Sequence, residues 1–322
     1  MPLPRNRQIS LTDTPYYHCV SRCVRRAFLC GENKETGQNY EHRRQWVEDR
    51  LLFLATVFTI DLCAYAVMSN HTHVILHVDQ IKAQKLTDKE VVQRWQKMHK
   101  PTLLVQRFMD CSSPQLTDEE FITLKSTISI YRKRLFDISW FMKELNEFIA
   151  RQANTEDDCT GHFWEGRFKS QALLDEHALA ACLVYVDLNP IRAQMAVSPE
   201  TSNHTSIKRR INDAKRGAQP KEMMPFVGDP KLHQPKGLTF NLQEYIQLVE
   251  LTAQSIHLGK RAKANIIGTP ILSKLGFNEH QWNVLSQCFE MTFSISAGTV
   301  ESLRRFQSHT KRKRMTGALV RL

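Results

Sequence analysis

The sequence predicts an α+β protein in which a small antiparallel sheet is combined with several amphipathic helices. Two observations carry this prediction. Residues 60–67 and 72–78 are runs of apolar and β-branched residues separated by a Ser-Asn bend, which is the pattern of a β-hairpin. Residues 138–154 and 175–188 place apolar side chains at the three- and four-residue spacing of helices that bury one face.

The other elements of the first half follow from similar patterns. Residues 16–21 follow a proline and are rich in aromatic and β-branched residues, which predicts a first strand. Residues 43–58 have helical spacing and would connect this strand to the hairpin. Residues 80–135 are polar with helical patterns, so we predict a helical insertion outside the sheet. A loop rich in glycine and aromatic residues at 160–168 would lead into a further strand.

The composition changes near residue 200, so we predict two regions. Residues 1–200 would form the main domain, and residues 201–322 an accessory region. Residues 213–238 are rich in Pro, Lys and Gly, which is typical of a linker or long loop. Helical patterns at 242–257 and 278–293 predict that the accessory region is a mainly helical C-terminal extension, which ends in a basic tail.

The charge of the chain favours a polyanionic partner. Hydrophobic residues make up 42% of the 322 residues and charged residues 24%, which is ordinary for a globular protein, but the net charge is +11. Such an excess favours nucleic acid as the partner, with an acidic membrane surface as the second choice. Over half of the net charge lies in the last 22 residues, which contain seven Lys or Arg and one Glu.

Neither a membrane span nor a disulfide framework is predicted. No apolar run approaches the ~18–20 residues that a membrane-spanning helix needs, and the first residues lack the apolar core of a signal peptide. The eight cysteines include no CxxC pair, which favours reduced thiols in a cytoplasmic protein. Cys19 and Cys23 could form a zinc site with His18, but no second pair completes it.

The most informative chemical pattern is a histidine pair in the second strand of the hairpin. His71 and His73 are two residues apart, so both would point to one face of the sheet while Thr72 points to the other. Two neutral imidazoles that converge on one point can begin a divalent-metal site. A structural role is the alternative for any strand histidine, and His77, in phase with the pair, is more simply an edge histidine than part of such a site.

A second pattern lies about a hundred residues later. Tyr185 and Asn189 are four residues apart and would share one face of a helix. If that face meets the histidine strand, Asn189 could add a carbonyl oxygen as third metal ligand and Tyr185 could present a phenolate. Two imidazoles and an amide oxygen suit Mg²⁺ or Mn²⁺. Periodicity alone would make Tyr185 a core residue, and Pro190 forces Asn189 to the helix boundary.

Taken jointly, these motifs resemble those of the single-tyrosine HUH transposases, especially the REP-associated tyrosine transposases. That family carries a His-hydrophobic-His pair on a central strand and, on a later helix, a tyrosine followed four residues on by Asn or Gln. Thr72 departs from the pattern but points away from the site. The matching positions are His71, His73, Tyr185 and Asn189. The resemblance covers about residues 10–200 and includes Tyr17-His18, Ser21-Arg22, the segment 163–170 and the segment 189–193.

The resemblance implies a ferredoxin-like or RRM-like antiparallel sheet with helices on one face. It also implies a nuclease and strand transferase that acts on single-stranded DNA near hairpins. Tyr185 would attack a backbone phosphate to form a 5′-phosphotyrosine link, and His71, His73 and Asn189 would hold a Mg²⁺ or Mn²⁺ ion that polarises this phosphate.

Single-stranded or hairpin DNA is therefore the expected partner, and a nucleoid-associated position in the cytoplasm is the expected location. The sequence does not decide between a monomer and a homodimer. Several side chains could contact the DNA, although each could equally be solvated or part of the core. These DNA-binding candidates are Arg22, Arg25, Trp164, Arg167, Lys169 and Arg192.

Two other functions stay open from the sequence alone. One is a domesticated hairpin-binding protein that does not cut DNA, although the intact His71, His73, Tyr185 and Asn189 count against it. The other is an unrelated metal phosphoesterase that activates water between the two histidines and does not need Tyr185. A covalent protein–DNA adduct that disappears in Tyr185→Phe would distinguish the three functions.

Overall fold

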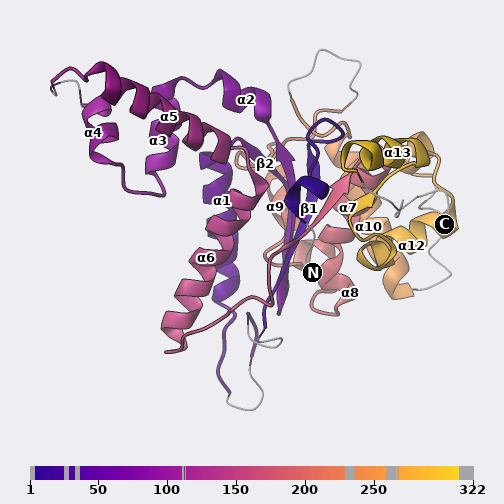
Figure 1. The fold of residues 1–322 in the computed structure, drawn as a ribbon. Coiled ribbons are helices and arrows are strands. Elements are labelled where there is room, and N and C mark those ends of the chain that lie inside the picture. Colours follow the sequence, from indigo (N-terminus) through magenta and orange to yellow (C-terminus); the bar gives the residue numbers. More distant parts are fainter. Residues whose placement is uncertain are drawn as a thin grey trace.

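A five-stranded sheet in the order β2-β3-β1-β4-β5 forms the centre of the molecule (Figure 1). The structure is a computed structural model and describes residues 4–24, 29–32, 37–110, 112, 114–228, 236–258, 266 and 268–311. The first four strands pair in antiparallel fashion, and the short β5 pairs with β4 in parallel. The strands are β1 (Tyr16–Arg22), β2 (Ile60–Val67), β3 (His71–Val78), β4 (Lys169–Leu173) and β5 (Ser296–Ala297).

The register of the sheet gathers polar side chains on one of its faces. In the pairing of β1 with β3, Arg22 lies opposite His71, and in the pairing of β1 with β4, His18 lies opposite Gln171. Residues directly opposite each other, and residues two apart on one strand, share a face. His18, Arg22, His71, His73 and Gln171 therefore all point to the same side of the sheet.

Helices cover both faces of this sheet (Figure 1). α1 (Arg43–Val57) and α6 (Ile138–Glu156) pack with one hydrophobic cluster, and α7 (Glu176–Asp187) and α12 (Glu279–Thr292) pack with the other. The predicted α+β class and the helical C-terminal extension are confirmed. The helices were expected on one face only, but β2 and β3 are apolar on both sides, and both sides must be buried.

In its described residues, the segment predicted as a helical insertion forms four helices outside the sheet, which project to one side of the molecule in Figure 1. α3 and α5 each begin with a capping box, formed by Thr87 with Glu90 and by Thr117 with Glu120. The helices are α2 (Gln80–Lys85), α3 (Asp88–Gln96), α4 (Leu103–Met109) and α5 (Asp118–Arg134).

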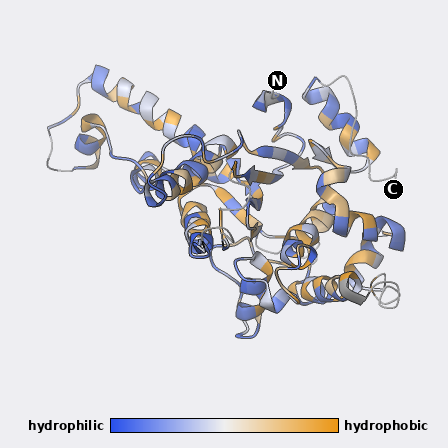
Figure 2. Cartoon of the chain, turned by 90° about the horizontal axis from the view of Figure 1, so that it is seen from below, coloured by the Kyte–Doolittle hydropathy of each residue, from blue (hydrophilic) through white to orange (hydrophobic). Residues whose placement is uncertain are grey.

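The region after residue 200 is packed into the same core as α7. One hydrophobic cluster contains Val184 of α7 together with Leu248, Trp282 and Phe289 from the later helices. The helices of Figure 2 carry both hydrophobic and hydrophilic positions, as amphipathic helices do. No helix among the described residues is long and apolar enough to cross a membrane. The remaining helices are η1 (Arg5–Arg7), α8 (Asn189–Arg192), η2 (Pro199–Thr201), α9 (Ser206–Ala214), α10 (Leu242–Leu258), α11 (Pro270–Leu275) and α13 (Val300–His309).

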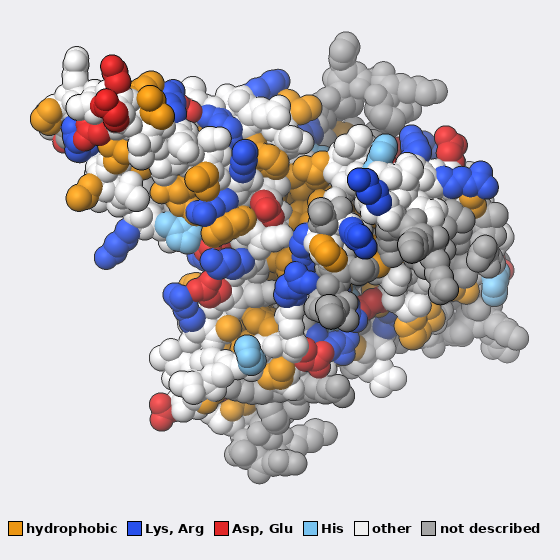
Figure 3. All heavy atoms as spheres, viewed as in Figure 1, with side chains coloured by type: hydrophobic (Ala, Val, Ile, Leu, Met, Phe, Trp, Pro, Cys, Tyr) orange, Lys and Arg blue, Asp and Glu red, His pale blue; other side chains and the backbone are white. Residues whose placement is uncertain are grey.

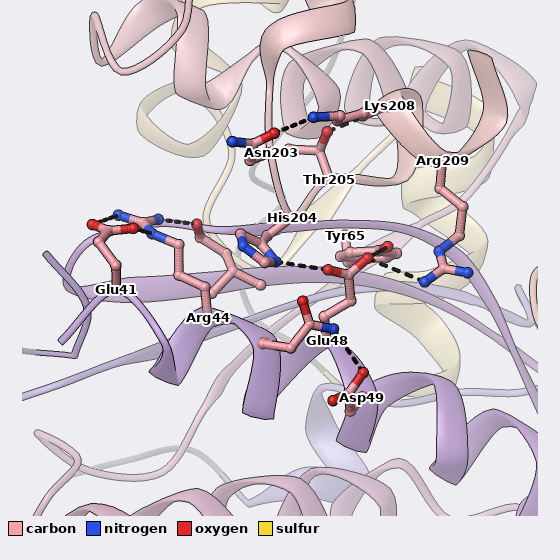
Figure 4. A network of polar contacts seen from close by, with 12 residues as sticks. Glu41, Arg44, Glu48, Asp49, Tyr65, Asn203, His204, Thr205, Lys208 and Arg209 are labelled. Carbon is pink, nitrogen blue, oxygen red and sulfur yellow. Dashed lines mark hydrogen bonds and ion pairs between the residues drawn. The ribbon is translucent and has the colours of Figure 1, made fainter. Parts of the chain in front are cut away.

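A polar network ties α1 to the C-terminal region at the β2 edge of the sheet (Figure 4). Glu48 of α1 accepts hydrogen bonds from the Tyr65 hydroxyl at 2.6 Å and from His204 Nδ1 at 2.7 Å, and Arg209 lies 3.4 Å away. Burial opposes the charge of Glu48, but these hydrogen bonds outweigh it and lower the pKa of the carboxyl. The predicted boundary near residue 200 stays a prediction, while the contacts across it are extensive.

Candidate active site

β3 directs both predicted metal ligands toward α7. The ring centroids of His71 and His73 are 4.7 Å apart, and Thr72 is buried on the opposite face, as the alternation of the strand predicts. His73 is 1% exposed, whereas His71 is half-buried. Burial, followed by nearby positive charges, lowers the pKa of His71 to about 4 and that of His73 well below its usual value. Both imidazoles are therefore neutral at pH 7, which is the form that binds metal.

Hydrogen bonds engage the Nδ1 atom of each imidazole. Asn70 Oδ1 lies 2.6 Å from His71 Nδ1, so this ring donates to the amide oxygen. His18 Nε2 lies 2.9 Å from His73 Nδ1. His73 Nε2 is buried and has no hydrogen-bonding partner within the described part of the chain. A buried polar atom of this kind is rare and fits a site that a ligand completes.

α7 places the predicted nucleophile beside the histidines. The ring centroid of Tyr185 is 5.9 Å from that of His73, and the side chain is 8% exposed. Phe289 of α12 packs against it at 5.8 Å. Burial raises the pKa of Tyr185, the charge of Arg192 lowers it, and the charge of Glu290 raises it further. The phenol is therefore protonated at pH 7.

The chain bends directly after the nucleophile helix, as Pro190 predicts. α7 ends at Asp187, and Asn189 is the first residue of the separate helix α8. The two predicted residues thus do not share one continuous helix. Asn189 is buried, and its amide nitrogen has no partner among the residues that the structure describes. The structure shows no hydrogen bond between this amide and the imidazoles among the described residues, so its ligand role stays a prediction.

Arg192 on α8 completes the wall of the site around Tyr185. Its guanidinium lies 3.9 Å from the centre of the Tyr185 ring, and its Nη1 donates to the carbonyl oxygen of Ser286 in α12 at 3.0 Å. Its Nη2 is buried and makes no well-formed hydrogen bond to a described residue, while the guanidinium lies close enough to the Tyr185 hydroxyl to donate to it and so lower the pKa of the phenol. A buried cationic donor of this kind favours an anionic ligand such as a phosphate.

Two further cations lie close enough to act on the histidines. The charges of Arg22, Arg192 and Lys169 all lower the pKa of His71, after the larger effect of burial. The Lys169 side chain is 76% exposed and lies 3.7 Å from Glu290 of α12. Elsewhere, Lys and Arg are spread widely over the face drawn in Figure 3. The surroundings of His71 are therefore electropositive, which suits a phosphate backbone.

The other predicted DNA-binding residues lie apart from this group. Trp164 packs with the α1 and α6 cluster on the opposite face, and its Nε1 donates to the carbonyl oxygen of Asn146 at 2.8 Å. Arg167 is exposed on the loop before β4. Arg25 lies outside the described residues, as do residues 312–322 with most of the basic tail.

The zinc site considered for Cys19, Cys23 and His18 is not formed. His18 points toward α7, whereas both cysteines belong to the cluster on the opposite face. Among the described residues, no three His, Cys, Asp or Glu side chains form a group that could hold a metal. A metal bound by His71 and His73 would therefore need further ligands of another kind, such as the Asn189 amide oxygen, water or phosphate.

The structure adds three residues that the sequence did not identify as site residues. His18 is buried between His73 and Gln171, and Glu290 approaches from α12. Of these three, only His18 was indicated by the sequence, because Tyr17-His18 is one of the segments that resemble the transposase family. Gln171 and Glu290 reach the site through tertiary contacts that no local pattern encodes.

Comparisons with known proteins add one structural likeness. No family model matches the chain, and no curated protein matches it. A solved structure titled "Structure of the REP associates tyrosine transposase bound to a REP hairpin" is similar at a TM-score of 0.39 and 13% sequence identity. The match covers 72% of this chain and 96% of that chain. A likeness of this size establishes neither a family nor an activity.

Proposed function

We propose that this chain is a metal-dependent endonuclease and strand transferase that acts on single-stranded DNA, at hairpins, through Tyr185. The observation that supports it is one cluster that joins His71, His73, Tyr185 and Arg192 by ring distances of 3.9 to 5.9 Å. Two buried polar atoms in this cluster, His73 Nε2 and Arg192 Nη2, make no well-formed hydrogen bond to a described residue. Atoms of this kind are available to bind a ligand.

His71, His73 and the Asn189 amide oxygen are the residues that would hold Mg²⁺ or Mn²⁺. When bound, such an ion supplies Lewis-acid polarisation of the scissile phosphate. The imidazole of His73 fits this role because it is neutral and its Nε2 is buried without a partner.

Tyr185 is the nucleophile in this proposal. Its oxygen forms a bond to phosphorus while the bond from phosphorus to the 3′ oxygen breaks, so the 5′ end stays on the protein and a 3′-OH is released. The phenol loses its proton and the departing 3′ oxygen gains one, so the net change is the transfer of one proton from Tyr185 to the released 3′-OH, and the Arg192 guanidinium over the ring favours the phenolate that forms on the way. Arg192 Nη2 would donate to a phosphate oxygen. Attack by a different 3′-OH reverses the step and joins two strands.

The cations near the histidines would guide the DNA backbone. Arg22 ends β1 opposite His71, and Lys169 begins β4 with its amine in solvent. Contacts of this type position a strand without reading its sequence. The net charge of +11 supports the same partner.

The test is a denaturing gel of the purified protein after incubation with labelled hairpin oligonucleotides from its own genome and Mg²⁺ or Mn²⁺. We expect a covalent shift that needs the metal and disappears in Tyr185→Phe. Tyr16→Phe is the matched control, since Tyr16 lies on the same face of the sheet as the histidine pair but contacts His77 at 4.8 Å and not His71 or His73. It should retain the shift.

Each other outcome points to a different function. A shift that persists in Tyr185→Phe contradicts the assignment of the nucleophile. Cleaved DNA without a shift indicates a phosphoesterase that activates water. Tight binding without cleavage, for every hairpin and both metals, indicates a protein that binds hairpins without cutting them.

A further inference from the structure

A chain of hydrogen bonds runs from the C-terminal region to the back of His73. Gln171 of β4 donates from Nε2 to the carbonyl oxygen of Phe293 at 2.7 Å. The Gln171 Oε1 atom lies 3.1 Å from His18 Nδ1, and His18 Nε2 lies 2.9 Å from His73 Nδ1. All four residues are buried, so water does not compete for these bonds.

The carbonyl oxygen of Phe293 can only accept a hydrogen bond, and this sets the donor and the acceptor in every other hydrogen bond of the series. The Gln171 amide must therefore present its NH₂ group to Phe293 and its oxygen to His18. An amide oxygen also only accepts, so His18 Nδ1 must carry a proton.

The same reasoning extends from His18 to His73. His18 is 1% exposed, and its two ring nitrogens face an amide and a second imidazole, so the ring stays neutral and holds one proton. Its Nε2 is then an acceptor, and the proton between the two rings belongs to His73 Nδ1. This leaves His73 Nε2 as a bare lone pair.

We propose that Gln171 and His18 are positioning residues that hold His73 in the tautomer whose Nε2 can bind a metal ion, and that the main chain at Phe293 anchors this arrangement. The inference rests on the metal role of His73 in the proposed function and deepens it. It gives the region after residue 200 a defined part in that site.

The deduced tautomer identifies the atom of His73 that a ligand would meet. Tracing the protons from Phe293 predicts a lone pair at His73 Nε2, and this is the ring atom that is buried without a partner among the described residues. Asn70 imposes the same tautomer on His71 by accepting from its Nδ1. A free imidazole side chain prefers to carry its proton on Nε2. The hydrogen bonds at His71 Nδ1 and His73 Nδ1 both favour the other tautomer, in which Nε2 has a lone pair that can bind a metal ion.

The direct test is a long-range ¹H–¹⁵N NMR spectrum of the metal-free protein labelled with ¹⁵N-histidine. We expect His73 to carry its proton on Nδ1 in the unmodified chain. In Gln171→Met, which removes both hydrogen-bonding groups at similar length, the His73 proton should move partly to Nε2. His18→Gln, which can keep an acceptor near the position of Nε2, should preserve the tautomer better than His18→Leu.

The second readout is Mn²⁺ affinity, measured by electron paramagnetic resonance of the free ion. Gln171→Met and His18→Leu should bind Mn²⁺ about 10- to 100-fold more weakly, the range typical for loss of a partner that orients a metal-binding histidine. His77→Leu is the matched control, because His77 is on the same strand and face but bonds to Asp61. It should leave both the tautomer of His73 and the Mn²⁺ affinity unchanged.

The outcomes separate this proposal from the proposed function. A His73 proton on Nε2 in the unmodified chain overturns the proposal, whatever the activity on DNA, and so does a Gln171→Met protein with unchanged tautomer and affinity. The expected tautomer in a protein that binds no Mn²⁺ would overturn the metal-dependent function while the hydrogen-bonded chain stands. The NMR spectrum of the unmodified chain decides the tautomer even where a variant does not fold.

Discussion

The two ends of β3 hold histidines in opposite electrostatic surroundings. At one end, His71 and His73 bond through Nδ1 to a neutral amide and a neutral imidazole. At the other end, His77 Nδ1 lies 2.9 Å from the carboxylate of Asp61. His71 and His73 lie beside Tyr185 and Arg192, whereas His77 is hydrogen-bonded to Asp61 and contacts Tyr16 outside that group. All three histidines share one face of the strand, so the neighbours and not the spacing distinguish the two candidate ligands from His77.

The largest expected difference between the two ends is in metal binding. His73→Ala should weaken Mn²⁺ binding by more than about 100-fold, because loss of a ligand costs at least as much as loss of its orienting partner. His77→Ala should change the affinity less than about 2-fold, since its ring is engaged with Asp61. Calorimetric titration with Mn²⁺ measures both. An equal loss of Mn²⁺ affinity in the two variants would show that the two ends of β3 do not differ in metal binding.

The next largest effect is expected from loss of the Asp61 carboxylate beside His77, which should lower the stability of the fold. Burial opposes the charge of Asp61, but hydrogen bonds from His77 and Lys236 outweigh it and lower the pKa of the carboxyl to about 2, from 3.8. A lowered pKa means that the stabilisation is present above pH 3.8 and is lost as the pH falls through about 2. Asp61→Asn should therefore reduce the free energy of unfolding by about 2 kcal/mol at pH 7.

The pH dependence of this loss identifies its origin. Urea unfolding of both proteins should show the difference shrinking between pH 5 and pH 2, as Asp61 in the unmodified protein takes up its proton. Asp49→Asn is a suitable control, because the hydrogen bond that Asp49 accepts from Gln45 is exposed to solvent. A difference that stays constant over this pH range would mean that the charge of Asp61 is not the cause.

The smallest effect should distinguish the two metal-binding histidines from each other. Asn70→Ala removes the acceptor of His71, which is half-buried, so water can replace the amide. We expect Mn²⁺ binding to weaken only about 3- to 10-fold, less than in Gln171→Met, where the partners are buried. The same calorimetric titration compares them. A loss in Asn70→Ala as large as that in Gln171→Met would contradict the role of burial.

The sequence predicts the local elements well because their causes are local. The runs at 60–67 and 72–78 became β2 and β3, and the alternation along β3 placed His71 and His73 on one face with Thr72 on the other. Pro190 predicted the bend that separates α7 from α8.

The parts that could not be predicted depend on contacts between distant segments. Gln171 reaches His18 only because β4 pairs with β1, and the sequence pattern of neither strand predicts which strand it pairs with. The approach of α12 to Tyr185, through Phe289, likewise depends on how the C-terminal region folds back. A helical pattern gives the apolar face of α12 but not the surface that the face will cover.

The position of α12 has a consequence for protein synthesis. Arg192 is held by a carbonyl 94 residues further along the chain, and Gln171 by one 122 residues further along. During translation, the ribosome therefore synthesises His71, His73 and Tyr185 well before it adds the segment 286–293, whose carbonyl groups hold Arg192 and Gln171. Until then a growing chain carries every motif residue without the contacts that complete the site, and a message cut short before this segment would encode the motif without them.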